Sequence, residues 1–285
     1  MGSSGGQLAT GTVAPENIPD DDPASSTNAP KLTFDELRAA LRRVGEERYH
    51  HKHPFHLLMH EGKLSRGQLQ AWALNRYYYQ SIIPIKDSIV LSRATDLSFR
   101  RVWRKRIADH DGQDGPENES RNGGIVRWIK LAEATGLNQE RVISGREVLP
   151  ATRFIGNEYL NLVRTRPFLE CVASSLTELF SKDLITLRME KLRQHYPWLS
   201  PGLDYFEARL TEAPEDAAFA IKYAFDHAAT RAEQASVIQA LRDKCDILWA
   251  QLDALYFAYV EPGWPPPGAF RINLHGDAEH GGHRA

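Results

Sequence analysis

The chain has 285 residues, 42% of them hydrophobic and 25% charged, with a formal net charge of −2. This is the composition of a water-soluble globular protein with enough apolar residues for a sizeable core. The small net charge disfavours nucleic acid or an anionic membrane as a partner, and no apolar run is long enough to cross a bilayer. The two cysteines, Cys171 and Cys245, lie in apolar helical patterns. We therefore expect reduced core thiols and a cytoplasmic protein.

The two ends of the chain differ in composition from its middle. Residues 1–31 are rich in Gly, Ser, Pro and Asp and lack the basic start and apolar stretch of a signal peptide, so they predict a disordered leader. The Pro- and Gly-rich residues 262–285 predict a flexible tail. Residues 32–261 show helical periodicity without strand-like alternation, which predicts one all-α domain, a bundle of about seven helices with short links.

Three helix starts are marked by a serine or threonine followed three residues later by Glu or Gln, the capping-box form, at Thr33, Ser65 and Thr230. Between the second and third of these starts, helices are expected over 98–109, 125–136, 150–166, 168–196 as one long helix, a short piece around 205, and 214–227. Turn-forming residues fill 112–124, which predicts a mobile surface loop.

The helix after Ser65 carries the most informative pattern. It is apolar on almost all sides, yet polar groups share one stripe at the 3.6-residue period. The stripe consists of Trp72, Arg76, Tyr79, Gln80, Ile83, Asp87 and Val90. Burying such groups costs several kcal/mol unless each finds a partner, so the stripe predicts the wall of a pocket. The alternative is a structural network between Arg76 and Asp87.

Histidines are concentrated just before this helix. His53, His56 and His60 share a helical face at spacings that could bind a metal. No carboxylate stands at a matching position and no HExxH pair occurs, so capping and partial exposure are favoured over a metal site. His50 is the better candidate for chemistry because it lies with Tyr49 at a helix-to-helix junction, where side chains can point into a cleft.

Further polar groups interrupt apolar helical patterns. They are Arg106 with His110, at positions i and i+4; Thr177 and Glu178, followed on the same face by Arg188; Tyr205 with Arg209; and Lys244 on the last helix. Each has a plain alternative as a solvated surface residue, a threonine bonded to its own helix, or a lysine lying along an apolar face. An interior that holds several cations, tyrosines and two histidines suits a small, aromatic, multiply anionic ligand.

Several longer strings closely resemble the pyrroloquinoline-quinone (PQQ) synthase family. They are HPFHLLMHEGKLSRGQLQAWALNRYYYQSIIPIKD, RIADHDG, SSLTELF, QHYPWL and CDILWAQLDALYFAY, within a resemblance that spans roughly Leu32 to Val260. The resemblance implies a haem-oxygenase-like bundle of about seven helices, assembled as a homodimer. It implies ring closure and multi-electron oxidation of the quinolinedicarboxylate precursor (AHQQ) to PQQ, with O₂ as acceptor and H₂O₂ released. It also implies that no metal or organic cofactor is needed, and we expect PQQ to be handed over to another protein.

The resemblance also implies roles for fourteen residues. As catalytic residues it implies His110 as general base or proton shuttle, Tyr205 and Arg209 near the oxygen pocket, His50 and Lys244. As substrate-binding residues it implies Tyr49, Arg76, Tyr79, Gln80, Arg106, Tyr159, Thr177, Glu178 and Arg188. Ile185 stands where many members carry a second histidine near the oxygen site, which removes a hydrogen-bond donor. We expect His110, Tyr205 and Arg209 to suffice without it.

Three other functions compete with this one. A haem-oxygenase-like metal-dependent oxidase would use the histidine run, and a non-catalytic carrier would bind PQQ or its precursor without converting it; Ile185 is the only sequence feature that favours the carrier. Thiamin-salvage hydrolases share the fold but need a cysteine nucleophile in the pocket, and neither cysteine stands in a suitable polar context.

Overall fold

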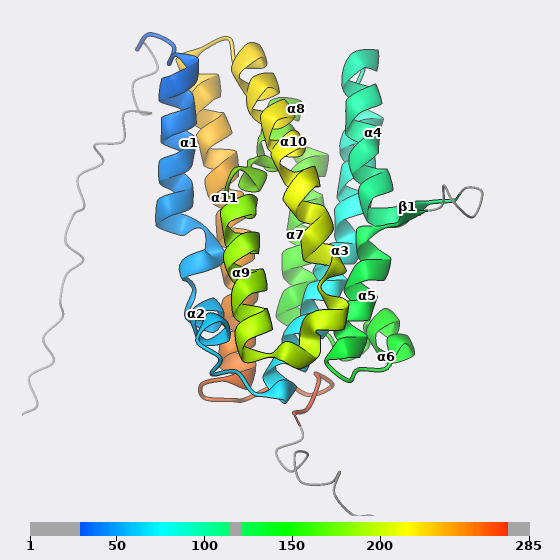
Figure 1. Ribbon diagram of the computed structural model, residues 1–285. Helices are drawn as coiled ribbons and strands as arrows, with labels where there is room; N and C mark the ends of the chain where they lie inside the picture. Colours follow the sequence, from blue (N-terminus) through cyan, green and yellow to red (C-terminus); the bar gives the residue numbers. More distant parts are fainter. Residues whose placement is uncertain (1–28, 115–120, 273–285) are drawn as a thin grey trace, which may run out of the picture.

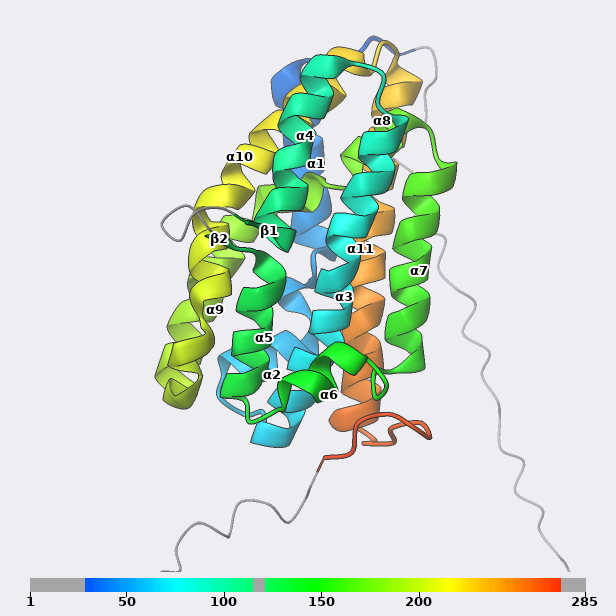
Figure 2. The ribbon, with the colours of Figure 1, turned by 90° about the vertical axis from the view of Figure 1, so that its right-hand side faces the viewer.

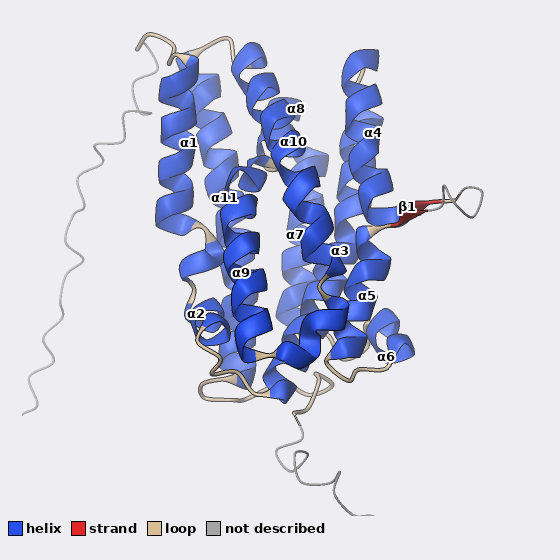
Figure 3. Ribbon diagram, in the orientation of Figure 1, coloured by secondary structure: helices blue, strands red, loops and turns tan. Residues whose placement is uncertain are grey.

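Eleven α-helices and three 3-10 turns make up nearly all of residues 29–114 and 121–272, the part of the chain that the computed structural model describes (Figures 1 and 3). The helices are α1 (Phe34–Arg48), α2 (Pro54–His60), α3 (Arg66–Arg93), α4 (Leu97–Asp111), α5 (Gly124–Ala134), α6 (Gln139–Ser144), α7 (Pro150–Thr165), α8 (Phe168–Ala173), α9 (Ser181–His195), α10 (Asp204–His227) and α11 (Arg231–Tyr259). The 3-10 turns are η1 (His50–Lys52), η2 (Leu176–Phe180) and η3 (Pro197–Gly202). The all-α prediction is confirmed; the count exceeds about seven because α2, α6 and α8 are only six or seven residues long.

The long helices run roughly along one axis, with α3 and α11 side by side in the interior (Figures 1 and 2). Helix α3 packs against α4, α5 and α7, and α11 packs against α1, α7 and α8. Helices α9 and α10 pack against each other on the opposite side of the bundle from α7 (Figure 2). No helix within the described ranges combines the length and the apolarity that crossing a membrane would require.

The three predicted capping boxes are present. The side chains of Thr33, Ser65 and Thr230 each accept a hydrogen bond from the backbone N–H three residues on, and the Glu or Gln at that position reaches back to the cap residue. Helix α3 is 28 residues long, contains Pro84 without ending there, and buries side chains on nearly all sides. Local sequence therefore set where the three helices begin.

Two predicted helical segments differ from the structure. The helix expected over 168–196 is broken into α8, η2 and α9, and the intervening η2 is held in 3-10 geometry where it packs against α10. Conversely, the two short pieces predicted between 205 and 227 form the single helix α10, which contains Pro214. Packing of α10 against α9 and η2 offsets the backbone hydrogen bond that the proline removes.

The fold extends beyond the predicted domain boundary at 261. Within 262–272, Phe270 is only 2% exposed, and its backbone N–H donates to the Glu147 carbonyl at 2.9 Å. The sequence predicted a flexible tail from 262. Within 262–272 only Ala269 and Phe270 are buried, and the Phe270 ring packs against the ring of Tyr259, so flexibility of the exposed residues before them stays a prediction. The rest of the predicted tail, 273–285, and the predicted leader up to residue 28 lie outside the described residues.

The segment expected as a loop over 112–124 brings its two ends together. β1 (Gly112–Gln113) pairs with β2 (Arg121–Asn122) in antiparallel register; residues 115–120 lie outside the described part. A Cβ atom on Gly123 would lie 2.2 Å from the Gly112 nitrogen and 2.3 Å from the His110 carbonyl oxygen. Only glycine permits this backbone contact, which fixes the end of α4 where His110 lies.

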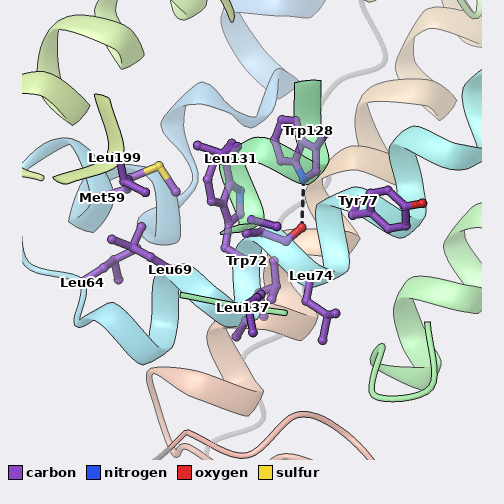
Figure 4. Close-up of a cluster of buried hydrophobic side chains, with 14 of the residues drawn as sticks. Met59, Leu64, Leu69, Trp72, Leu74, Tyr77, Trp128, Leu131, Leu137 and Leu199 are labelled. Carbon is purple, nitrogen blue, oxygen red and sulfur yellow. Dashed lines mark hydrogen bonds between the residues drawn. The ribbon is translucent and has the colours of Figure 1, made fainter. Parts of the chain in front are cut away.

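Two hydrophobic clusters fill the bundle. One surrounds Trp72 and Trp128 (Figure 4). The indole N–H of Trp128 donates to the Ala73 carbonyl at 2.9 Å. The other surrounds Trp103 and includes both cysteines, which are free thiols as predicted. Residues of both clusters line the pocket described next, so that pocket lies between the two parts of the core.

Candidate active site

A single buried pocket collects all fourteen residues that the sequence singled out. Its cavity volume is about 90 Å³. The fourteen are Tyr49, His50, Arg76, Tyr79, Gln80, Arg106, His110, Tyr159, Thr177, Glu178, Arg188, Tyr205, Arg209 and Lys244. They come from α3, α4, α7, α9, α10, α11 and the turns η1 and η2, so no single element carries the site.

Three of the pocket's cations have no carboxylate partner within the described ranges. Arg76 donates to the Gln251 side-chain oxygen at 3.2 Å, and Arg188 lies 3.1 Å from both ring nitrogens of His56. The amine of Lys244 contacts the phenol oxygen of Tyr79. Burial lowers the pKa of all three groups: that of Arg188 falls to about 10, and for Arg188 and Lys244 the positive charge of Arg76 adds to the effect. This half of the pocket therefore carries positive charge that an anionic ligand could neutralise.

Two parallel aromatic rings flank Lys244. The rings of Tyr79 and Tyr159 are stacked at 6.2 Å with an angle of 2° between their planes, and the amine lies 3.3 Å from the Tyr159 ring centre. Arg76 also lies over the Tyr79 ring, at 4.4 Å. Aromatic faces attract cations without supplying a negative charge, so they hold these side chains and leave the charge available.

The other half of the pocket is electrically balanced. Arg209 pairs with Glu178 at 2.9 Å, and Arg106 pairs with Asp216 at 2.7 Å. Burial alone would raise the pKa of Glu178, but Arg209 and Arg106 outweigh it and lower the pKa to about 2. Glu178 is therefore a permanent anion that fixes the two guanidiniums.

The alternative network between Arg76 and Asp87 does not form. Eleven residues along one helix separate their Cα atoms by about 16 Å, since each residue rises about 1.5 Å. Asp87 pairs instead with Lys86 at 2.5 Å and lies 3.5 Å from Arg106. Arg76 is thereby left without an acidic partner in its own helix.

His110 is a buried imidazole in the pocket wall. Its Nδ1 lies 2.9 Å from the Arg106 carbonyl oxygen, to which it donates, so Nε2 carries the lone pair. Burial and the nearby charge of Arg209 lower the pKa of His110 to about 4, so the imidazole is neutral at physiological pH. A neutral, buried imidazole that lines the pocket can accept a proton there.

The histidine run is divided between structure and pocket. His53 caps α2: its Nδ1 accepts from the Phe55 N–H, and its Nε2 lies 2.9 Å from Asp253. Both ring nitrogens are therefore occupied, which counts against His53 as a metal ligand. No group of three potential ligands for a metal ion occurs in the part of the chain that the structure covers. His50 lines the pocket, and its Nδ1 lies 3.1 Å from Nδ1 of His56.

Sequence reasoning missed Lys86, Ser175 and Asp216. Lys86 and Ser175 line the pocket, and Asp216 joins Arg106 to Arg209, from which it lies 3.5 Å; Asp87, already named on the stripe, pairs with Lys86 and is not among the lining residues. The adjacent Lys86 and Asp87 inside an apolar helix were the one available signal, because a buried charge needs a partner. Nothing in the pattern of α10 distinguishes Asp216 from its exposed acidic neighbours.

Ile185 and the two cysteines are placed clearly. Ile185 lines the pocket and belongs to the cluster around Trp128. An apolar side chain therefore stands where the family resemblance implies a histidine, a hydrogen-bond donor, in many members. Cys171 and Cys245 are buried in the other cluster and are not among the lining residues of the pocket.

The buried histidines predict that acid destabilises the fold. Burial lowers the pKa of His110 and His60 to about 4, and it lowers the pKa of His50 and His56 well below the ordinary value. The folded protein thus binds fewer protons than the unfolded chain between pH 6.5 and 4. Its stability is complete above about pH 6.5 and falls as the pH drops; His110 alone contributes a loss of about 2 kcal/mol between pH 7 and 5. Urea unfolding at several pH values measures this, and a flat profile would contradict it.

Comparison with known proteins agrees with this description. The sequence profile of the TENA/THI-4/PQQC family matches residues 38–254. Proteins of Granulibacter bethesdensis and Acidiphilium cryptum, both named pyrroloquinoline-quinone synthase, are 54% identical to the chain over 240 residues, which is 84% of this chain and 92% and 96% of theirs. A Methylorubrum extorquens protein named bifunctional coenzyme PQQ synthesis protein C/D is 49% identical over 250 residues, 87% of this chain and 66% of its own length.

Solved structures share the fold at low identity. A Shewanella denitrificans domain of unknown function, described as having a heme oxygenase-like fold, superposes with a TM-score of 0.65 at 14% identity, covering 81% of this chain and 96% of its own. A TenA homolog from Pseudomonas syringae pv. tomato gives a TM-score of 0.60 at 11% identity, covering 81% and 98%. These matches confirm the predicted haem-oxygenase-like architecture. The profile match over residues 38–254 and the relatives at 54% identity place this chain in the TENA/THI-4/PQQC family.

Proposed function

We propose that this protein is a pyrroloquinoline-quinone synthase. It would close a ring in the quinolinedicarboxylate precursor and oxidise it to PQQ, with O₂ as acceptor and H₂O₂ as the released product. The names of the relatives at 49–54% identity support the assignment. The observation that carries it is the meeting of Arg76, Arg188 and Lys244 in one buried pocket without carboxylate partners among the described residues, which suits a flat polycarboxylate.

Each part of the pocket has a distinct task in this proposal. The uncompensated cations bind the precursor's carboxylates, and the neutral imidazole of His110 accepts a proton as the ring is oxidised. Each two-electron oxidation passes two electrons and two protons from the precursor to one O₂, which forms one H₂O₂. Tyr205 and Arg209 lie on the balanced half, where Arg209 can stabilise the negative charge that O₂ acquires as it takes up electrons.

The decisive experiment supplies the precursor without oxygen. Purified, chelator-treated protein is mixed anaerobically with the precursor, and air is then admitted. We expect quinone absorbance and H₂O₂ to appear only after air enters and to be unaffected by the chelator. Absence of both products contradicts the proposal. Activity that the chelator abolishes favours the metal-dependent oxidase instead, and binding of PQQ without conversion of the precursor favours the carrier.

The remaining expectations belong to the same proposal. We infer that the protein forms a homodimer, acts in the cytoplasm and needs neither a metal nor an organic cofactor. The C/D relative contains additional sequence beyond its match to this chain, which supports a hand-over of PQQ or its precursor to a second pathway protein. Light scattering in solution tests the dimer. A thiamin-salvage activity is disfavoured because neither cysteine lines the pocket.

A further inference from the structure

The two uncompensated arginines are both held by neutral groups. The side-chain oxygen of Gln251 accepts from Arg76 at 3.2 Å, while its amide N–H donates to the Asn75 carbonyl at 3.3 Å, and this second bond fixes the amide orientation. Gln251 is 1% exposed and lies on α11, and Arg76 extends from α3. The contact therefore joins the two central helices behind the pocket.

His56 holds Arg188 in an equivalent way. Nδ1 of His56 lies 2.9 Å from the His50 carbonyl oxygen and donates to it, which leaves Nε2 as an acceptor 3.1 Å from the Arg188 guanidinium. The ring is buried, and burial together with Arg188, His50 and His60 keeps its pKa well below the ordinary value, so it is neutral. Nε of Arg188 is buried and has no hydrogen-bond partner among the described residues.

A second, smaller cavity marks the place where these supports meet. Its volume is about 10 Å³, and it is lined by His50, His56, Arg76, Arg188 and Gln251 together with apolar side chains. It shares His50, Arg76 and Arg188 with the main pocket, so the supports stand directly behind the pocket wall.

The contrast with the other half of the pocket is chemical. Arg106 and Arg209 are held by the carboxylates of Glu178 and Asp216, which cancel most of their charge. A neutral acceptor fixes a guanidinium by a hydrogen bond but leaves its charge uncancelled in a weakly screened interior. Whether a neutral group or a carboxylate lies behind each arginine therefore sets the net charge of each half of the pocket.

We propose that Gln251 and His56 are positioning residues that determine the ligand class: as neutral supports they orient Arg76 and Arg188 without neutralising them, and so reserve this half of the pocket for the carboxylates of an aromatic polyacid. The inference rests on the proposed function and extends it to two residues that sequence reasoning did not assign to the site. It predicts that one added negative charge behind Arg76 is enough to weaken recognition of the acid.

The variant Gln251→Glu tests this, because it keeps the size of the side chain and adds one charge. Affinity is measured by fluorescence titration with PQQ, a tricarboxylate, and with its trimethyl ester, which has the same ring system without the charges. We expect the Kd for PQQ to rise at least about tenfold and the Kd for the ester to stay within about twofold. In turnover the same variant should raise KM for the precursor more than it lowers kcat.

Two matched variants separate charge from packing. Gln251→Met removes the hydrogen bond without adding charge and should weaken PQQ binding less than Gln251→Glu. His56→Gln keeps a neutral acceptor and should retain binding, whereas His56→Glu should lose it. Equal loss for PQQ and its ester, or equal affinity of Gln251→Glu and wild type, overturns the inference. If the wild-type protein binds no PQQ at all, the proposed function itself fails, and this inference fails with it.

Discussion

Replacing His110 with asparagine is expected to lower kcat for precursor oxidation by a factor of about 10² to 10⁴, the usual contribution of a general base. The amide can still donate to the Arg106 carbonyl, as Nδ1 of the imidazole does, so the end of α4 keeps its hydrogen bond. What is lost is the lone pair on Nε2. Because an amide nitrogen or oxygen does not accept a proton at neutral pH, the oxidation loses its base while the cations that bind the substrate remain.

The chain offers a matched control for this variant. His227 makes the same local contact, with Nδ1 2.9 Å from the carbonyl oxygen of Tyr223 at the end of α10, but it is exposed and does not line the pocket. His227→Asn should leave kcat and KM unchanged. Stopped-flow turnover measures kcat, and PQQ titration measures the binding affinity separately. If His110→Asn alters only the affinity for PQQ and leaves kcat intact, His110 is a binding residue rather than a base.

Two buried lysines of the same pocket are expected to respond to the same substitution with opposite signs. Lys244→Met should raise the free energy of unfolding by about 1 to 4 kcal/mol, because the amine has no carboxylate partner in the described chain and its pKa is lowered by burial and by Arg76. Because the pKa of Lys244 is lower in the folded protein than in the unfolded chain, burying its charged amine costs free energy that a methionine avoids. Lys86→Met should lower the free energy of unfolding by about 1.5 to 3 kcal/mol, since it removes the closer of two cationic partners of the buried Asp87 and leaves only Arg106 at 3.5 Å.

Activity should fall in the variant that gains stability. Lys244→Met removes a cation from the half of the pocket proposed to bind carboxylates, so we expect weaker PQQ binding together with a higher midpoint of urea unfolding. The stabilisation should shrink as the pH rises towards the ordinary lysine value, because the unfolded chain then also loses its proton. Denaturation curves for both variants at pH 7 and pH 9 give this comparison. Two destabilised variants would show that Lys244 is compensated after all.

The sequence predicted part of the site, as α3 and α4 show. The stripe on α3 predicted a pocket wall, and Arg76, Tyr79 and Gln80 do line the pocket. The placement of His110 at the end of α4 followed from its spacing to Arg106. Roles for these residues came from the resemblance to a family, because a periodic pattern states which face is buried and not what meets it there.

The sequence did not predict which charged groups pair. The pattern suggested Asp87 as a partner for Arg76, but Asp87 pairs with Lys86. Arg76 instead donates to Gln251, which lies 175 positions further along the chain. Asp216 likewise reaches Arg106 and Arg209 only because α10 packs where it does. Such contacts join side chains that are distant in sequence, and no local periodicity encodes them.

By itself the sequence determined the helices, their capped starts and the residues that face inward, since these depend on hydrogen bonds and apolar spacing within a few residues of each position. The tertiary structure alone decided where the chain breaks between α8 and α9, how Phe270 is buried, and which pocket cations keep their charge. Those outcomes depend on packing and on electrostatic partners brought together from different helices, and the balance among several such partners exists only once the bundle has formed.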